Sequence, residues 1–229
     1  ISSNDGNIIL SGTTTSTNTG HYGIESVGRT VSAVNGSVTF QGSKMTSASS
    51  GSGLFVNAAG TMSGGTPNLP APVFAVADSA GIASAATNGI NWTGAITANT
   101  TNGQINLYAK APVISGVMTA YGLLLATADQ SYSLTGSNSV IKVLAGNIGT
   151  GSLSFQTASN LAIGSLSGID GFTGSGLTIT ETATLTQTKP ISVSTLTLSG
   201  GSSSVFVLDQ ANTVSTSITL NNGTLKVGN

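Results

Sequence analysis

The sequence predicts an all-β fold, a right-handed parallel β-helix (β-solenoid) of about ten coils with roughly 20 residues in each coil. Two observations lead to this prediction. Aliphatic residues alternate with Thr and Ser along much of the chain, and short aliphatic runs bounded by Gly recur at a spacing close to the length of one such coil. Period-two alternation is typical of a strand with one buried face, and regular recurrence of such strands is typical of stacked coils.

The alternation is clearest between residues 177 and 200. Aliphatic side chains fall on odd positions from Leu177 to Val193, with threonines on even positions, and then on even positions at Leu196 and Leu198. A slip of one residue turns the apolar side chains of a strand to its other face. The sequence therefore predicts a corner or bulge near Ser194, where one flat face of the solenoid gives way to the next.

Strand signals occur along the whole chain, and the expected strands are short and mostly bounded by Gly, Asn or Ser. Helix signals are almost absent: the Ala-rich run 75–86 is the one candidate, and Gly81 weakens it. The expected strands lie at 6–12, 36–42, 53–60, 90–98, 103–109, 139–146, 151–159, 176–186, 191–200, 204–209, 217–220 and 223–228.

The repeating unit is Gly-x-aliphatic-x-aliphatic or aromatic. Later units, around Leu177, Leu196 and Ile218, keep a spacing near the length of one coil. Coils stacked about 4.8 Å apart would make ten of them into a rod of roughly 50 Å. Because the repeat is imperfect, an array of β-sandwiches is the second interpretation. The clearest units begin at Gly6, Gly36, Gly103 and Gly151.

One stretch interrupts the rhythm. Residues 64–72 hold three of the five prolines, and Pro cannot donate to an inner ladder of a sheet. We expect a loop that leaves the rod, or a boundary between solenoid segments. The predicted organisation is solenoid coils over 1–63, a Pro/Gly loop or boundary over 64–74, and further coils over 75–229.

The composition excludes several classes of function. Charged residues make up 6% of the 229 residues, and the net charge is −1, so no basic surface for nucleic acid or anionic membrane is expected. No apolar run is long enough for a membrane-spanning helix, and cysteine is absent. Ser, Thr and Gly number 34, 33 and 31, but the spread of β-branched and aliphatic residues argues against disorder. Both ends look cut, and we expect a piece of a longer chain.

Several stretches resemble bacterial secreted exoproteins. Residues 88–109, 176–200 and 204–220 are similar to the filamentous haemagglutinin family of two-partner-secretion adhesins, and 211–213 with 220–228 resemble the passenger repeat of autotransporters. Together they cover 72 of the 229 residues. The resemblance implies a secreted β-helix shaft, exported through an outer-membrane β-barrel pore and presented on the bacterial cell surface.

Candidates for catalysis are few. His21 is the single histidine, and Glu25 could orient it, but a turn position is the simpler interpretation. With no Cys and no second His, neither zinc nor another cofactor is expected. Asp129, Asp170 and Asp209 follow one another at intervals close to two coils. Carboxylates about 10 Å apart exceed the separation of a retaining glycosidase pair and reach the limit of an inverting one. The alternative interpretation is that the three aspartates are turn residues that hydrogen-bond to their own backbone.

Binding surfaces are a second class of candidate. Trp92 and Tyr108, with the same three aspartates, are candidate contacts for a receptor or glycan. The pairs Thr178/Thr180 and Thr195/Thr197 are similar to flat threonine arrays that bind ice. Four Asn-x-Ser/Thr sequons are candidate glycosylation sites, at Asn35, Asn91, Asn99 and Asn222.

Repeated alternation without a catalytic constellation predicts a non-enzymatic secreted protein, the shaft of an adhesin or a self-stacking extracellular fibre. Its expected partners are a surface receptor or glycan on host cells, bacteria or biofilm, the secretion pore during export, and further copies joined end to end. Two alternatives stay open. One is a polysaccharide-acting enzyme, a lyase or glycoside hydrolase, on the same scaffold, and the other is a passive matrix or ice-binding protein.

Overall fold

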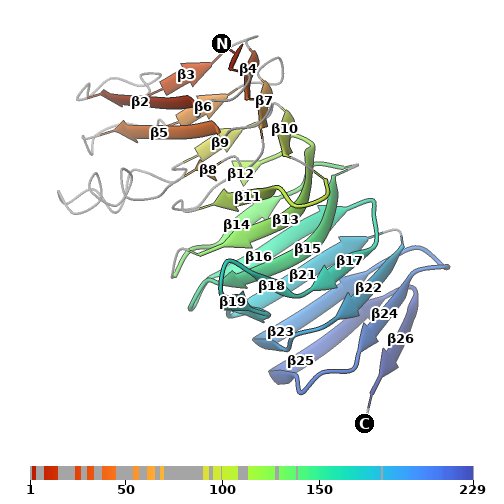
Figure 1. Cartoon of the computed structure of the whole chain (residues 1–229). Coiled ribbons are helices and arrows are strands. Elements are labelled where there is room, and N and C mark those ends of the chain that lie inside the picture. The colour runs from red at the N-terminus through yellow and green to blue at the C-terminus, as the bar shows by residue number, and fades with distance from the viewer. Residues whose placement is uncertain are drawn as a thin grey trace.

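The computed structural model describes residues 100–107, 113–126, 129–137, 139–181 and 183–228, and before them the separate strands between residues 2 and 98, largely as backbone. The described chain is an all-β parallel β-solenoid of about five turns with coils of roughly 21 residues. The strands stack one above another from the N-terminus to the C-terminus (Figure 1). This confirms the predicted fold class.

Three parallel ladders run along the solenoid, and the second of them ends at the first half of β15. The first contains β3 (Ile24–Ser26), β6 (Leu54–Val56), β9 (Ile90–Trp92), β12 (Val113–Ile114), β14 (Tyr132–Leu134), β16 (Ser152–Thr157), β21 (Gly176–Glu181), β23 (Ile191–Ser199) and β25 (Thr213–Asn221). The second contains β1 (Ser2–Ser3), β4 (Thr30–Ala33), β7 (Thr61–Gly64), β10 (Ala95–Ala98), and the first halves of β13 (Met118–Leu125) and β15 (Val140–Asn147). The short strand β20 (Phe172–Thr173) pairs with the end of β15 and with the start of β23.

The third ladder shares the second halves of β13 and β15, because these long strands bend from one face of the solenoid to the next. Its other members are β2 (Ile8–Thr14), β5 (Val38–Lys44), β8 (Asn68–Leu69), β11 (Gln104–Leu107), β17 (Leu161–Ile163), β22 (Thr184–Gln187), β24 (Val205–Leu208) and β26 (Thr224–Val227). Two remaining strands pair with each other antiparallel, β18 (Ser165–Leu166) and β19 (Ile169–Asp170).

Coil length follows from the residues that lie side by side in neighbouring coils. Tyr132 lies beside Leu153, a separation along the chain that matches the predicted repeat. Nearer the N-terminus, Ile8 lies beside Val38, so the coil between them is longer. The extra residues lie in the connections, such as the one between β2 and β3. The total of ten coils and the right-handed sense stay predictions.

The predicted Pro/Gly loop lies partly within the ladders. Asn68 of β8 pairs with Thr39 on one side and Asn106 on the other. This strand is short because prolines lie directly before and after it, and they cannot donate to a ladder. The rest of 65–89, including the Ala-rich run, lies outside the described residues.

The core is a narrow spine of aliphatic and aromatic side chains. Inward residues stack in columns, because each residue lies in register with an inward residue of the next coil. Burial alternates along the strands as the sequence predicts. One column consists of Tyr132, Leu153, Leu177 and Leu196, and a second of Leu134, Phe155, Ile179 and Leu198, all of them buried.

The change of phase along β23 is a bulge. The amides of Ser194 and Thr195 both donate to the carbonyl oxygen of Ser175, at 2.9 and 3.1 Å. Against the following strand, β25, the register shifts by one residue between Val193 and Thr195, as at a β-bulge. Val193 before it and Leu196 after it both face the core. The predicted corner near Ser194 is confirmed.

An outer hairpin, residues 164–171 with β18 and β19, leaves the solenoid between β17 and β20. It folds back across the outside of the preceding coils, where Leu166 packs against Leu124 and Ala145. The Ser167 hydroxyl donates to Gln104 Oε1 at 2.9 Å. The hairpin therefore covers an apolar area that the outer face of a coil would otherwise expose to water.

Candidate functional site

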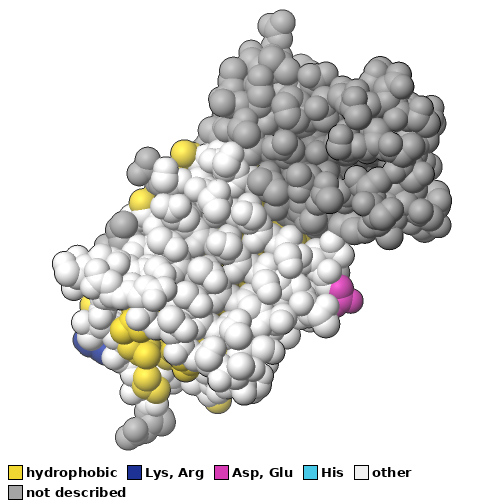
Figure 2. Space-filling view, turned by 180° about the vertical axis from the view of Figure 1, so that it is seen from behind, with side chains coloured by type: hydrophobic (Ala, Val, Ile, Leu, Met, Phe, Trp, Pro, Cys, Tyr) yellow, Lys and Arg dark blue, Asp and Glu magenta, His cyan; other side chains and the backbone are white. Residues whose placement is uncertain are grey.

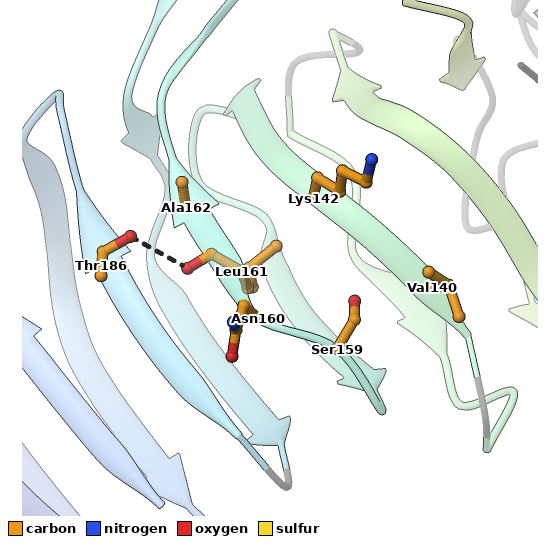
Figure 3. A pocket seen from close by; sticks show the side chains of 7 residues that line it. All are labelled: Val140, Lys142, Ser159, Asn160, Leu161, Ala162 and Thr186. Atoms are coloured by element: carbon orange, nitrogen blue, oxygen red, sulfur yellow. Dashed lines mark hydrogen bonds between the residues drawn. The ribbon is translucent and has the colours of Figure 1, made fainter. Parts of the chain in front are cut away.

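A groove of about 400 Å³ is hollowed into the outer face of the solenoid. It lies across three successive coils, with residues from β15, from the corner before β17, from β17 itself and from β22 (Figure 3). Its lining consists of Val140, Lys142, Ser159, Asn160, Leu161, Ala162 and Thr186.

The groove forms where two neighbouring coils are incompletely joined. Toward the following coil, β15 pairs with β17 through Val143 and Leu144, and the residues before them have no strand partner there. One side-chain bond crosses the gap, from Ser159 Oγ to the carbonyl oxygen of Ile141 at 3.1 Å. The early end of β15 and the corner at 159–160 thus form opposite walls.

Polar groups line this groove above an aliphatic floor. The Thr186 hydroxyl donates to the carbonyl oxygen of Leu161 at 3.5 Å (Figure 3). Asn160 Oδ1 accepts from the amide of Thr184 at 3.2 Å. Lys142 is exposed and has no ion-pair partner among the described residues. The groove can therefore offer one cation, hydroxyls and an amide to a ligand.

The three aspartates singled out from the sequence have separate surroundings. Asp129 Oδ1 accepts from the amide and the hydroxyl of Thr150 in the next coil, both at 2.9 Å. These bonds lower the pKa of Asp129. The Asp129 backbone has a φ of 59°, which Asp tolerates better than most residues. This aspartate joins two coils at a corner.

Asp170 belongs to the outer hairpin. Its carboxylate accepts from Lys189 Nζ at 2.8 Å and from the hydroxyl of Ser165, and these bonds lower its pKa. Asp209 follows β24 and accepts from Gln210 Nε2 at 3.3 Å. Within the described ranges, no three acidic or histidine side chains converge on a point that could hold a metal ion.

The remaining predicted residues are placed unevenly. Trp92 and Asn91 lie in β9, where the backbone alone is described, and Asn91 lies beside Val113. Asn222 is exposed in the turn before β26, with a φ of 67°, and its Oδ1 accepts from the amide of Gly223. Glu25 lies in β3, again as backbone. Outside the described residues lie His21, Asn35, Asn99 and Tyr108. These candidate sites stay predictions.

A column of half-buried and exposed hydroxyl side chains runs along the first ladder, on the side away from the core. Its members lie in register in successive coils, so their spacing is that of the ladder, about 4.8 Å. Figure 2 shows how few charged side chains interrupt the described surface on the side that it presents. The column consists of Ser133, Ser154, Thr178, Thr197 and Thr219.

Two features of this surface were missed by the sequence reasoning. Lys142 lacked a signal of its own, because a single lysine at an outward strand position is ordinary. The outer hairpin did leave a signal: Leu123, Leu124 and Leu125 break the alternation, and a continuous apolar run indicates a strand covered on both faces.

In the part of the chain that the structure describes, no helix has the length and apolar character needed to cross a bilayer. Comparisons of the whole chain with protein-family models, with curated proteins and with solved structures found no match.

Proposed function

We propose that this chain is part of the shaft of a secreted, non-enzymatic adhesin or extracellular fibre on a bacterial surface. The observation that supports this most directly is the set of three in-register parallel ladders around one apolar spine. Such a scaffold is stiff along its axis, because every coil is hydrogen-bonded to the coils before and after it. A stiff, weakly charged rod is suited to holding a binding surface away from a cell.

The proposal includes finer features. The solenoid is right-handed and continues to about ten coils, or roughly 50 Å at about 4.8 Å per coil. The resemblance to filamentous haemagglutinin and autotransporter passengers supports export through an outer-membrane pore. Parallel coils suit this route, since each coil can form on the one before it as the chain emerges.

We propose that the groove beside Lys142 is the site that contacts the target surface, and that its ligand is an acidic saccharide. An unpaired ammonium attracts a carboxylate or sulfate group. The hydroxyls of Ser159 and Thr186 and the amide of Asn160 can bond to sugar hydroxyls. The groove opens to solvent on the side of the solenoid, so a saccharide chain can reach it.

Binding to a panel of acidic and neutral polysaccharides tests this assignment. Replacing Lys142 by Gln should lower affinity for acidic members about 1.4- to five-fold, since one exposed ionic contact contributes roughly 0.2–1 kcal/mol. The matched control is Lys226→Gln, the same charge change on β26, outside the groove. Equal losses in both variants, or equal binding to neutral members, would contradict the assignment. If the protein bound neither the polysaccharides, nor host cells, nor biofilm, the adhesin proposal itself would be contradicted.

The last described coil supports the fibre form of the proposal. Ile218 and Leu220 of β25 lie in register with the core residues Leu196 and Leu198, yet they are 48% and 37% exposed. Val227 of β26 is 69% exposed. Hydrophobic side chains gather at this end (Figure 2). A strand edge with apolar residues is a template for a further coil, which the same chain or a second copy can supply.

Sedimentation velocity tests the fibre form. We expect the sedimentation coefficient to rise with concentration, and Ile218→Lys to abolish the rise, because a charge would be buried at the joint. Val117→Lys is the matched control, because it also replaces an exposed aliphatic side chain by lysine. Val117 is 37% exposed and lies in an earlier coil, where its carbonyl oxygen accepts from the amide of Ile96. A protein that stays monomeric at high concentration would remove the fibre and leave the single shaft.

A further inference from the structure

Glu181 is a buried acidic residue in the C-terminal half of the solenoid. It ends β21, in phase with the core residues Leu177 and Ile179, and it is 1% exposed. Its neighbour in the preceding coil is Thr157, which is also buried. The carboxyl group therefore lies inside the corner between two faces, where a core column ends.

Among the described residues, no side chain or backbone group makes a well-formed hydrogen bond to either carboxylate oxygen of Glu181. The hydroxyls around it are directed to backbone atoms. Thr157 Oγ1 donates to the carbonyl oxygen of Ser139 at 3.0 Å, and Ser204 Oγ donates to the backbone carbonyl of Glu181 itself at 3.2 Å. Both residues are buried. The neighbouring hydroxyl groups thus do not solvate the carboxylate.

The described elements around this corner also lack a positively charged side chain that could compensate the charge of the Glu181 carboxylate. β16 and β23, which flank β21 in the ladder, carry no ionisable side chain, and the same holds for β22 and β24. The segments 200–204 and 135–137 also lack one. Desolvation of an unpaired carboxylate favours its neutral form. Burial raises the pKa of Glu181 to about 7, although the nearby amide of Leu185 acts in the opposite direction.

We propose that Glu181 makes the C-terminal coils of the solenoid proton-dependent. With the carboxyl group protonated, the corner is neutral and the coils formed by β21 to β26 stay closed. Ionisation places an unpaired charge inside the corner, and the charge is relieved when β23 and the coils beyond it open. The rod is therefore tightest in mildly acidic surroundings and loosens above neutrality.

The direction of the effect follows from proton linkage. Below pH 4.5, the ordinary value, the group is protonated in both the folded and the unfolded chain, so the folded state has its full stability. As the pH rises toward about 7, the unfolded chain releases its proton first, and stability falls. Over this window the unfolding equilibrium should shift by roughly two orders of magnitude toward the unfolded state.

Thermal unfolding of the wild type and of Glu181→Gln between pH 5 and pH 8 tests the proposal. Gln is nearly isosteric with protonated Glu and cannot ionise. We expect similar Tm values at pH 5 and a higher Tm for the variant at pH 8. Both proteins carry the same other titratable groups, so the difference between them isolates Glu181. Asp129 and Asp170 have lowered pKa values and titrate below this window.

Two results would overturn the proposal: a wild-type Tm that does not fall between pH 5 and pH 8, or a fall of equal size in Glu181→Gln. If the variant fails to fold, infrared spectroscopy of the wild type decides. A buried carboxylic acid shows a protonated carbonyl band, which should persist at pH 6 and vanish by pH 8. No such band at pH 6 would also end the proposal. Hydrogen exchange, corrected for intrinsic rates, should show that the amides of β23 and β25 lose protection at a lower pH than those of β13 and β15 as the pH is raised.

Discussion

Gly171→Ala should destabilise the protein by roughly 2–5 kcal/mol, the sum of a left-handed backbone penalty and an overpacking penalty. Gly171 closes the outer hairpin with a φ of 72°, and its amide donates to the carbonyl oxygen of Gly164 at 2.8 Å. An added Cβ would lie 2.1 Å from the carbonyl oxygen of Pro190 in the next coil. Because that atom is backbone, the coils themselves must separate to admit a methyl group.

Gly168→Ala is the matched control, since it makes the same change in the same hairpin. Gly168 has a φ of 83°, but no atom would lie within 4 Å of its added Cβ. It should therefore cost only the backbone penalty, about 1–2 kcal/mol. Chemical unfolding of both variants measures the difference. Equal destabilisation would mean that the close approach of Gly171 to Pro190 does not constrain the coils.

Phe155→Ala is expected to cost about 3–5 kcal/mol, the usual range for removing a buried aromatic ring. Phe155 is 1% exposed and lies between Leu134 and Ile179 in a core column. The neighbouring coils are held apart by backbone hydrogen bonds at a fixed spacing, so they cannot collapse into the space that the ring leaves. A cavity should remain, and its cost adds to the lost burial.

Two controls separate the cavity from other effects. Phe155→Leu keeps most of the volume and should cost less than about 1.5 kcal/mol. Ser154→Ala, one residue earlier on the exposed face, should change stability by less than about 0.5 kcal/mol. The midpoint of urea unfolding measures all three. A small effect of Phe155→Ala would contradict the inward phase of β16.

The prediction from the sequence succeeded where one local rule decides the structure. Alternation determined which side of β21 and β23 is buried, and its change of phase located the bulge at Ser194 and Thr195. The same rule also places Glu181 inside, because 181 is an odd position in phase with Leu177 and Ile179. That consequence was overlooked, since a glutamate is usually assumed to be exposed.

The groove and the outer hairpin required more than a local rule. Lys142 meets Asn160 and Thr186 because three coils stack with a particular register, and β17 begins too late to pair with the start of β15. The contact of Ser167 with Gln104 joins residues 63 positions apart. No stretch of a few residues in the sequence indicates either the groove or this contact. The three aspartates show the same difficulty, because their spacing is regular but their hydrogen-bond partners in the structure differ.

By itself, the sequence determined that this chain forms strands, which faces of those strands are buried, and that the strands stack in coils. These follow from side-chain periodicity, which is a property of neighbouring residues. The tertiary structure alone decided the greater length of the coil between Ile8 and Val38, the position of the groove, the cover over Leu124 and Ala145, and the isolation of the Glu181 carboxyl group. Each of these depends on which residues of different coils come into register, and register is set by the packing of the whole stack.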